Sequence, residues 1–273
     1  MKMKISRRDF LKMGAKGLLG GIVLSSAPYL LKALPLMTGK VARAAAGREL
    51  ERHNWTFICD NEKCIGCGLC VVACKKENKV PWDPKFNRTW VERYIVTETE
   101  EIFVDSPNGG RDGFQHHPPD LDLVKNKVWK SFFVPKLCNQ CDKPPCVTVC
   151  PVGATYKTDD GVVLVDQEHC IGCRYCVQAC PYGARYVLPD YSQTHFGQVR
   201  VVDKCTWCYH RINRGLVPAC VEVCPVGARV FGDLNDPTST LKSILAEKRF
   251  YVLKPELGTQ PKVWYIGFEK GVY

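Results

Sequence analysis

Residues 170–181 of this chain read CIGCRYCVQACP, in which four cysteines have the spacing C-x2-C-x2-C-x3-C and Pro181 follows. Three thiols spaced in this way can curl a short loop around three corners of an iron–sulfur cube. The fourth cysteine lies about one helical turn further on and points away from the loop, toward a second cube. Pro181 cannot continue a helix, so it ends the segment. The run therefore predicts [4Fe–4S] clusters.

Cysteine groups of this kind occur four times in the chain. Groups one to four are, in order, Cys64, Cys67, Cys70, Cys74; Cys138, Cys141, Cys146, Cys150; Cys170, Cys173, Cys176, Cys180; and Cys205, Cys208, Cys220, Cys224. Of the 17 cysteines only Cys59 lies outside them. We expect Cys59 to be a buried strand thiol, because a free cysteine behaves as a small hydrophobe.

The segments that follow three of the groups also repeat. They read CPVGATYKT from Cys150, CPYGARYVL from Cys180 and CPVGARVFG from Cys224. In each segment a C-P-x-G-A turn leads into β-branched or aromatic residues, which predicts a short strand. Asp160-Gly161, between two apolar runs, predicts a hairpin. The repeat unit is that of a small two-cluster ferredoxin module.

Groups two and three are close in the chain, so we expect them to share one module, with groups one and four sharing a second module wrapped around it. In this nested arrangement the fourth cysteine of each group binds the cluster of its partner group. The predicted ligand sets are Cys64, Cys67, Cys70 and Cys224 (cluster 1); Cys205, Cys208, Cys220 and Cys74 (cluster 2); Cys170, Cys173, Cys176 and Cys150 (cluster 3); and Cys138, Cys141, Cys146 and Cys180 (cluster 4).

The predicted fold class is α+β, with two nested two-cluster ferredoxin modules and a β-rich insertion. The stretch RTWVERYIVTETEEIFV, from residue 88, is rich in β-branched and aromatic residues and indicates strands. LKSILAEKRF, from residue 241, predicts a helix followed by extended chain. The predicted segments are 55–97 with 199–235 for the outer module, 98–130 for the insertion, 131–190 for the inner module and 236–273 for a C-terminal docking tail.

The charge distribution argues against a nucleic-acid-binding protein. The net charge of the 273 residues is +10, and residues 1–46 supply +8 of it, with nine Lys or Arg and one Asp. The remaining 227 residues carry 29 basic against 27 acidic side chains, a net charge of about +2. A nucleic-acid binder concentrates basic charge in its folded body. We therefore expect no nucleic-acid partner.

Residues 1–46 have the three regions of a secretory signal. Arg7 and Arg8 are adjacent in a basic start, a modestly apolar stretch follows, and small residues at Ala44 and Ala46 suit a signal peptidase. The paired arginines look like a twin-arginine (Tat) signal, which predicts export to the periplasm by the Tat translocase. An amphipathic basic helix and an uncleaved anchor are the alternatives. The longest uncharged run, residues 17–31, is short for a membrane span.

Other cysteine chemistries fit the spacing less well. Exported, cysteine-rich chains are usually disulfide-bonded, but a disulfide scaffold predicts no fourfold repeat. Zinc sites use C-x2-C pairs separated by longer linkers, a pattern that only group four resembles. No C-x-x-C-H occurs, so attached haem is unsupported. We interpret the adjacent His116 and His117 as surface residues and the aromatic residues close to the groups as core: Trp129, Phe132, Phe133, Trp207 and Tyr209.

Taken together, the groups and their flanking segments resemble a known family. The stretches CIGCGLCVVACKKEN, KLCNQCDKPPCVTVCPVGATYKTDDGVVLVD, CIGCRYCVQACPYGARY, DKCTWCYHRINRGLVPACVEVCPVGARVFGD and VLKPELGTQPKVWYIG are similar to the four-cluster iron–sulfur subunit of the dimethyl-sulfoxide-reductase superfamily. Within it, the subunits of tetrathionate, polysulfide and nitrite-linked systems are nearest in pattern. The resemblance covers nearly all of residues 55–267.

The resemblance implies a non-catalytic, electron-transfer subunit with four [4Fe–4S] clusters. Its implied partners are a molybdopterin catalytic subunit and an integral-membrane, quinone-reactive subunit. Electrons would pass between the clusters of groups one, four, three and two, in that order, with group one facing the catalytic partner. Two alternatives are a ferredoxin-like subunit of a sulfite-reduction-linked transmembrane complex, whose first group is usually not intact, and a free periplasmic ferredoxin shuttle.

Overall fold

The computed structural model describes residues 53–115, 127–190 and 200–269. The predicted signal at 1–46, with Arg7 and Arg8, and the His116–His117 pair lie outside the described residues. None of the helices within the described ranges is both long enough and apolar enough to cross a membrane.

The first sheet joins the start of the described chain to two strands near its end. Its central strand β1 (Trp55–Asp60) pairs antiparallel with β9 (Arg229–Asp233) and parallel with β10 (Val263–Ile266). Phe57, Ile58 and Cys59 of β1 are fully buried. The prediction that Cys59 is a buried strand thiol is therefore confirmed.

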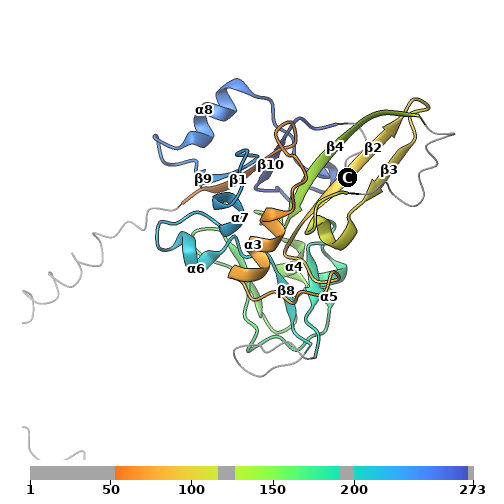
Figure 1. Ribbon diagram of the computed structural model, residues 1–273. Coiled ribbons are helices and arrows are strands. Elements are labelled where there is room, and N and C mark those ends of the chain that lie inside the picture. The colour runs from red at the N-terminus through yellow and green to blue at the C-terminus, as the bar shows by residue number, and fades with distance from the viewer. Residues whose placement is uncertain (1–52, 116–126, 191–199, 270–273) are drawn as a thin grey trace, which may run out of the picture. The chain divides into compact units, whose positions relative to one another are not determined.

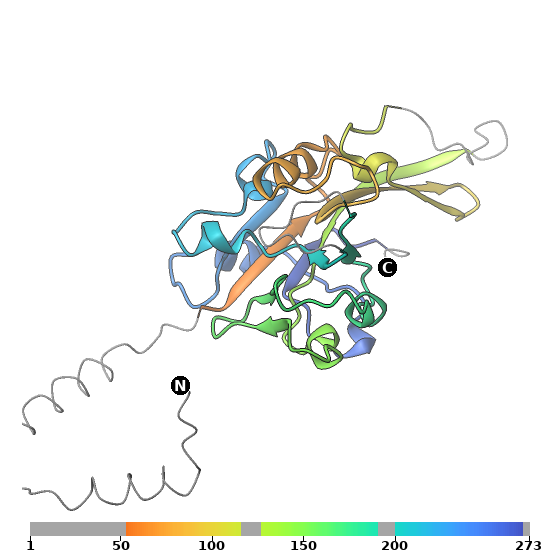
Figure 2. The same cartoon turned by 90° about the horizontal axis from the view of Figure 1, so that it is seen from below.

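The second sheet lies between cysteine groups one and two and extends away from the first sheet in both views (Figures 1 and 2). It has the order β3–β2–β4, in which β2 (Thr89–Thr97) pairs antiparallel with β3 (Ile102–Asp105) and β4 (Val128–Leu137). A 3-10 turn, η1 (Pro107–Gly110), follows β3. The strands that the sequence predicts within residues 88–104 are present.

Two small hairpins follow the cysteine groups. They pair β5 (Thr155–Lys157) with β6 (Val163–Val165), and β7 (Arg185–Val187) with β8 (Val202–Lys204). The predicted turn at Asp160-Gly161 closes the first hairpin, with Gly161 at φ 83°. Strands β5, β7 and β9 each begin directly after a C-P-x-G-A turn, as the repeat predicts.

Short helices carry later cysteines of each group. They are α3 (Leu69–Glu77), α4 (Pro145–Thr148), α5 (Tyr175–Gln178) and α7 (Ala219–Glu222), and a further short helix, α6 (Tyr209–Ile212), begins directly after Cys208. Helix α3 of group one contacts α7 of group four, and α4 of group two contacts α5 of group three. The helix contacts thus bring group one together with group four, and group two together with group three.

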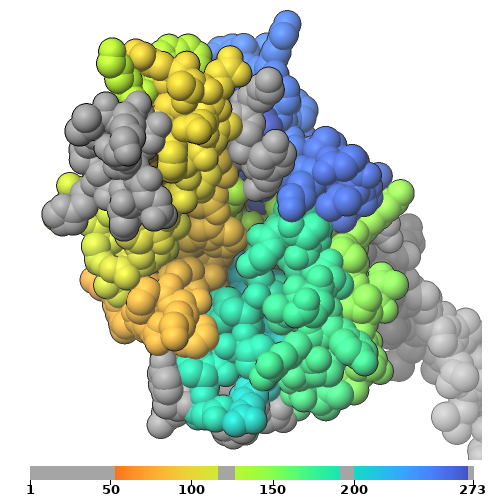
Figure 3. Space-filling view, turned by 90° about the vertical axis from the view of Figure 1, so that its right-hand side faces the viewer, coloured from red at the N-terminus to blue at the C-terminus, as the bar shows by residue number. Residues whose placement is uncertain are grey.

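The C-terminal segment is part of the folded body. Helix α8 (Thr240–Glu247) buries Leu241, and the 3-10 turn η2 (Pro255–Leu257) precedes β10. Tyr182, just after group three, shares a hydrogen bond of 2.5 Å with Thr259. Figure 3 shows this C-terminal stretch (blue) against the segment near residue 180 (teal). Backbone hydrogen bonds also join Lys262 to Asn139 and Gln260 to Asp142, so the segment that the sequence assigns to a docking tail packs on the segments that carry groups two and three.

Gly68 holds the second sheet against the first cysteine group. It has φ +75°, and a Cβ there would lie 2.3 Å from the carbonyl oxygen of Gly110 and 2.4 Å from that of Arg111. We expect Gly68→Ala to lower the free energy of unfolding by about 2–5 kcal/mol, combining the left-handed conformation with overpacking. The urea midpoint of the anaerobic protein measures this. Gly153→Ala, with φ +68° and no atom within 4 Å, is the control and is expected to lose only about 1–2 kcal/mol. Equal losses would contradict the close approach.

Candidate iron–sulfur centres

The first hollow lies at the start of α3. The four cysteines that line it are Cys64, Cys67, Cys70 and Cys224, the set that the sequence predicts for cluster 1. The first three come from the loop and first turn around Gly68, whereas Cys224 comes from the end of the α7 segment. Cys67 is exposed, so this hollow reaches the surface.

Two further hollows contain the sets that the sequence predicts for clusters 2 and 4. One is lined by Cys74, Cys205, Cys208 and Cys220, and the other by Cys138, Cys141, Cys146 and Cys180. In both hollows the fourth cysteine of one group lies with the first three of another. All of these cysteines are buried except Cys180, which is half-buried.

The set predicted for cluster 3 is brought together through α4 and α5. Cys150 ends the α4 segment, and Cys170, Cys173 and Cys176 surround the start of α5, which contacts α4. The Cys150 Sγ accepts a hydrogen bond from the Thr155 backbone N–H at 3.4 Å, and the Cys170 Sγ accepts one from the Val202 N–H at 3.5 Å. Cys173 is exposed, so group three also reaches the surface.

The geometry of these cysteines fits clusters better than single ions or disulfides. All seventeen cysteines are free thiols. Within residues 53–115, 127–190 and 200–269, no three His, Cys, Asp or Glu side chains converge closely enough to hold one metal ion. Zinc draws its sulfur ligands to within about 2.3 Å of one point. Four thiols that face each other across a hollow instead suit a group of several iron and sulfur atoms.

Burial raises the pKa of several of these thiols, so they stay protonated until iron binds. Desolvation raises the pKa of Cys64 to about 11 and the pKa of Cys141 and Cys220 to about 12. The pKa of Cys150 is instead lowered, because the backbone N–H groups of residues around Thr155 hydrogen-bond its sulfur. Iron must displace the protons of the buried thiols, so cluster assembly releases protons and is coupled to folding.

Two buried arginines point to an anionic group in the hollows. Arg229 is 3% exposed and lines the first hollow, yet its Nη1 and Nη2 have no hydrogen-bond partner among the described residues. Arg185 is 4% exposed, and its Nη2 lies 3.0 Å from the Cys146 Sγ. A buried cation without a counter-ion is costly. The anionic thiolates and cluster of an iron–sulfur centre would satisfy both side chains.

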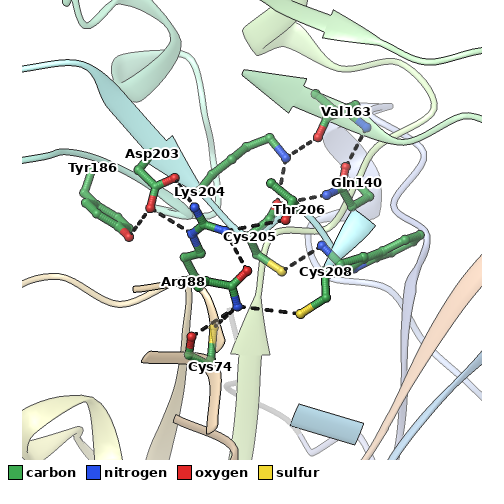
Figure 4. A network of polar contacts seen from close by, with 12 residues as sticks. Cys74, Arg88, Gln140, Val163, Tyr186, Asp203, Lys204, Cys205, Thr206 and Cys208 are labelled. Carbon is green, nitrogen blue, oxygen red and sulfur yellow. Dashed lines mark hydrogen bonds and ion pairs between the residues drawn. The ribbon is translucent and has the colours of Figure 1, made fainter. Parts of the chain in front are cut away.

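A polar network supports the second hollow (Figure 4). Asp203 accepts two hydrogen bonds of 2.8 Å from Arg88 and one of 2.5 Å from the Tyr186 hydroxyl. Arg88 Nη1 donates to Asn78 Oδ1 at 3.0 Å, and Asn78 Nδ2 lies 3.6 Å from the sulfurs of both Cys74 and Cys208. The network therefore aims an amide donor at two predicted ligands of one cluster. Donors to cluster sulfurs are a main determinant of reduction potential.

A second part of this network joins groups two and four. The buried Gln140 of group two donates to the Cys205 carbonyl at 2.9 Å and accepts from the Val163 N–H at 2.7 Å. Lys204, also buried, donates to the Cys205 carbonyl at 2.8 Å and to that of Val163. These bonds hold the loop of group two against the loop of group four.

The contact between groups two and four differs from the cluster order that the resemblance implies. That order places group three between groups four and two. In the structure the Cys138 thiol of group two lies close enough to Cys205 for its charge to raise the pKa of Cys205, and Gln140 bonds to the Cys205 carbonyl. Group three has the exposed Cys173. These contacts place group two directly beside group four, where the implied order has group three, because adjacency depends on tertiary packing.

Sequence reasoning also missed the residues around the sulfurs. No local sequence motif predicts the roles of Arg88, Asn78 and Gln140. The two arginines could have been found, since Arg185 and Arg229 occupy the same position of the C-P-x-G-A repeat. Trp207 is a core residue, as predicted, but Trp129 is 65% exposed, so its predicted place in the core is wrong. Trp129 lies on β4, at the end of the second sheet that projects into solvent.

The fold and the hollows define a ferredoxin-type protein that binds several clusters, and comparisons with known proteins agree. A model described as "4Fe-4S dicluster domain" matches residues 129–234, and a second model of that description matches residues 63–154. Two dicluster domains give four [4Fe–4S] clusters.

Curated relatives extend the likeness over most of the sequence. A tetrathionate reductase subunit of Salmonella typhimurium is 43% identical over 80% of this protein and 74% of its own length. A polysulfide reductase subunit of Wolinella succinogenes is 38% identical over 79% and 95%. The Hdr-like menaquinol oxidoreductase iron-sulfur subunit 1 of Archaeoglobus fulgidus is 33% identical over 96% and 97%. The protein belongs to the iron–sulfur subunits of the dimethyl-sulfoxide, tetrathionate and polysulfide reductase superfamily, and it is an electron-transfer subunit, not a catalytic one.

Proposed function

We propose that this protein carries electrons between a molybdopterin catalytic subunit and a quinone-reactive membrane subunit of an exported respiratory oxidoreductase. A [4Fe–4S] cluster takes up or releases one electron with little movement of its surroundings. The protein's part is to hold four such clusters in a row and to keep water from them. The observation that carries the proposal is that groups one and three, at the two ends of the row, each have an exposed cysteine, Cys67 and Cys173.

The ligand sets in this proposal are the nested ones. Cluster 1 is held by Cys64, Cys67, Cys70 and Cys224; cluster 2 by Cys205, Cys208, Cys220 and Cys74; cluster 3 by Cys170, Cys173, Cys176 and Cys150; and cluster 4 by Cys138, Cys141, Cys146 and Cys180. The shared hollows support three of these sets, and the contact between α4 and α5 supports that of cluster 3. The outer module then comprises 55–97 and 199–235, and the inner module 131–190, with the 98–130 segment inserted and the 236–273 segment packed on both.

Apolar side chains at both ends of the row support docking to two partners. Ile65 and Leu69 are exposed beside Cys67, and Ile171 and Tyr175 are exposed beside Cys173. Exposed apolar groups of this kind mark interaction surfaces. We assign the group one end to the catalytic subunit and the group three end to the membrane subunit. The basic start with Arg7 and Arg8 supports export through the Tat translocase and a periplasmic location.

Iron content tests the cofactor assignment directly. The anaerobically purified protein is expected to contain about sixteen iron and sixteen acid-labile sulfide atoms per molecule, because each of the four clusters has four of each. Reduction with dithionite is expected to produce low-temperature EPR signals. Colourless protein without iron, or stoichiometric zinc, would contradict the proposal.

Co-purification distinguishes the candidate complexes. Mild detergent extraction of membranes is expected to yield this protein with a molybdopterin subunit and a membrane subunit. A second candidate is a subunit of a menaquinol-oxidising complex, favoured by the near full-length match to the Archaeoglobus fulgidus protein. Partners without molybdopterin would select that candidate, and a soluble monomer would select a free shuttle.

A further inference from the structure

The three C-P-x-G-A turns are each followed by a buried side chain at the same repeat position. These residues are Thr155, Arg185 and Arg229, which begin β5, β7 and β9 and are 3%, 4% and 3% exposed. Group one has no such turn, because Lys75 follows Cys74 directly. The repeat therefore supplies one buried arginine to the inner pair of cysteine groups and one to the outer pair.

Arg229 lies beside both hollows of the outer pair. It lines the first hollow together with Cys64 and Cys70. Strand β9, which Arg229 begins, contacts helix α7, which carries Cys220 of the second hollow. The Arg229 Nη1 and Nη2 atoms have no hydrogen-bond partner among the described residues, so both can donate to a group bound in the hollow.

Arg185 has the equivalent place in the inner pair. It lines the hollow of Cys138 and Cys146, and its Nη2 donates to the Cys146 Sγ at 3.0 Å. Cys146 in turn packs in one buried cluster with Cys176, which belongs to the predicted set of cluster 3. Its Nη1 donates to Thr155 Oγ1 at 3.2 Å, so Thr155 holds the guanidinium in place.

We propose that Arg185 and Arg229 are bridging cations, one for each two-cluster module, and that each raises the reduction potentials of both clusters beside it. An oxidised [4Fe–4S] cluster with four thiolates carries −2, and reduction adds a further negative charge. Two neighbouring clusters therefore oppose each other's reduction in a buried site, where charges are weakly screened. A cation held between them favours the reduced form of both. The inference rests on the ligand sets of the proposed function.

The test is a redox titration of the isolated holoprotein followed by EPR, with iron counted in every sample. In Arg229→Gln, the ratio of oxidised to reduced cluster at a fixed potential is expected to rise at least tenfold for clusters 1 and 2, which equals a fall of about 59 mV for a one-electron couple. Clusters 3 and 4 are expected to keep their potentials. Arg185→Gln is expected to give the reverse pattern. Arg214→Gln, at an exposed arginine, is the control and is expected to shift none.

The result separates this inference from the cluster assignment. Wild-type protein without iron would overturn the proposed function, whereas sixteen irons and unshifted potentials in both glutamine variants would overturn only the bridging role. A shift confined to one cluster, or equal shifts in all four, would also overturn it. Should a glutamine variant fail to bind iron, the lysine variant at that position decides, since it keeps the charge. Iron bound by Arg229→Lys and Arg185→Lys supports the proposal, and iron lost from both contradicts it.

Discussion

Replacing Cys224 with alanine is expected to remove cluster 1, although Cys224 belongs to the fourth cysteine group. In the structure Cys224 lines the first hollow with Cys64, Cys67 and Cys70, and it is absent from the hollow of Cys205, Cys208 and Cys220. A cubane that loses one thiolate ligand is expected to lose at least one iron or to fail to assemble. The EPR signal of cluster 1 should therefore disappear, while that of cluster 2 remains.

Reference variants identify the signal that is lost. Cys67→Ala removes a ligand of cluster 1 and Cys208→Ala a ligand of cluster 2, whichever way the fourth cysteines are assigned. Cys224→Ala is expected to match Cys67→Ala, and Cys74→Ala is expected to match Cys208→Ala. Iron counts and EPR redox titrations of the four variants provide the comparison. A match of Cys224→Ala to Cys208→Ala would contradict the nested arrangement.

The crossed ligands have a consequence for folding. Cys70 and Cys224 lie on α3 and after α7, which are close only in the folded protein. Iron therefore bridges segments that are far apart in sequence, and cluster binding contributes directly to stability. Without iron, the buried thiols and the unpartnered Arg229 remain in the core, so we expect the apoprotein to be largely unfolded.

Local patterns were sufficient to predict the cysteine groups and the strands. The hairpin at Asp160-Gly161 and the strands after each C-P-x-G-A turn depend on a few adjacent residues, so the sequence predicts them. The partner of a strand is a tertiary property. The sequence predicts extended structure near residue 264, but nothing in VWYI indicates that β10 pairs in parallel with β1.

The order of the clusters depends on long-range packing. The spacing of groups two and three shows that they belong together, but the contact that sets their order is between Gln140 and Cys205, which are 65 positions apart. Neither residue is unusual in its own segment. The bridging arginines could be predicted in part. The repeat gives their positions, but only the structure shows that Arg229 is buried among thiols and has no hydrogen-bond partner among the described residues.

Arg88→Met is expected to lower the free energy of unfolding by about 3–5 kcal/mol, because it leaves the buried Asp203 carboxylate without its cation. The pair has both hydrogen bonds at 2.8 Å, and the two side chains are 14% and 6% exposed. Among the described residues, the Asp203 carboxylate would then retain the hydrogen bond from the Tyr186 hydroxyl. Arg200→Met is the matched control: its pair with Asp190 is 66% and 61% exposed, so the free energy of unfolding there is expected to change far less. Urea midpoints of the anaerobic holoproteins measure both.

The same substitution is expected to change the reduction potential of cluster 2. Arg88 holds Asn78, whose amide lies 3.6 Å from the sulfurs of Cys74 and Cys208, so the amide loses its anchor in Arg88→Met. Weaker donation to cluster sulfurs lowers the potential. Asn78→Leu removes the donor but keeps the Arg88–Asp203 pair, so it is expected to lower the potential of cluster 2 with a smaller loss of stability. Because Arg88 precedes β2 and Asp203 lies on β8, one buried ion pair joins two segments 115 positions apart and also orients the Asn78 donor toward the ligands. An unchanged cluster 2 potential in both variants would show that the network is only structural.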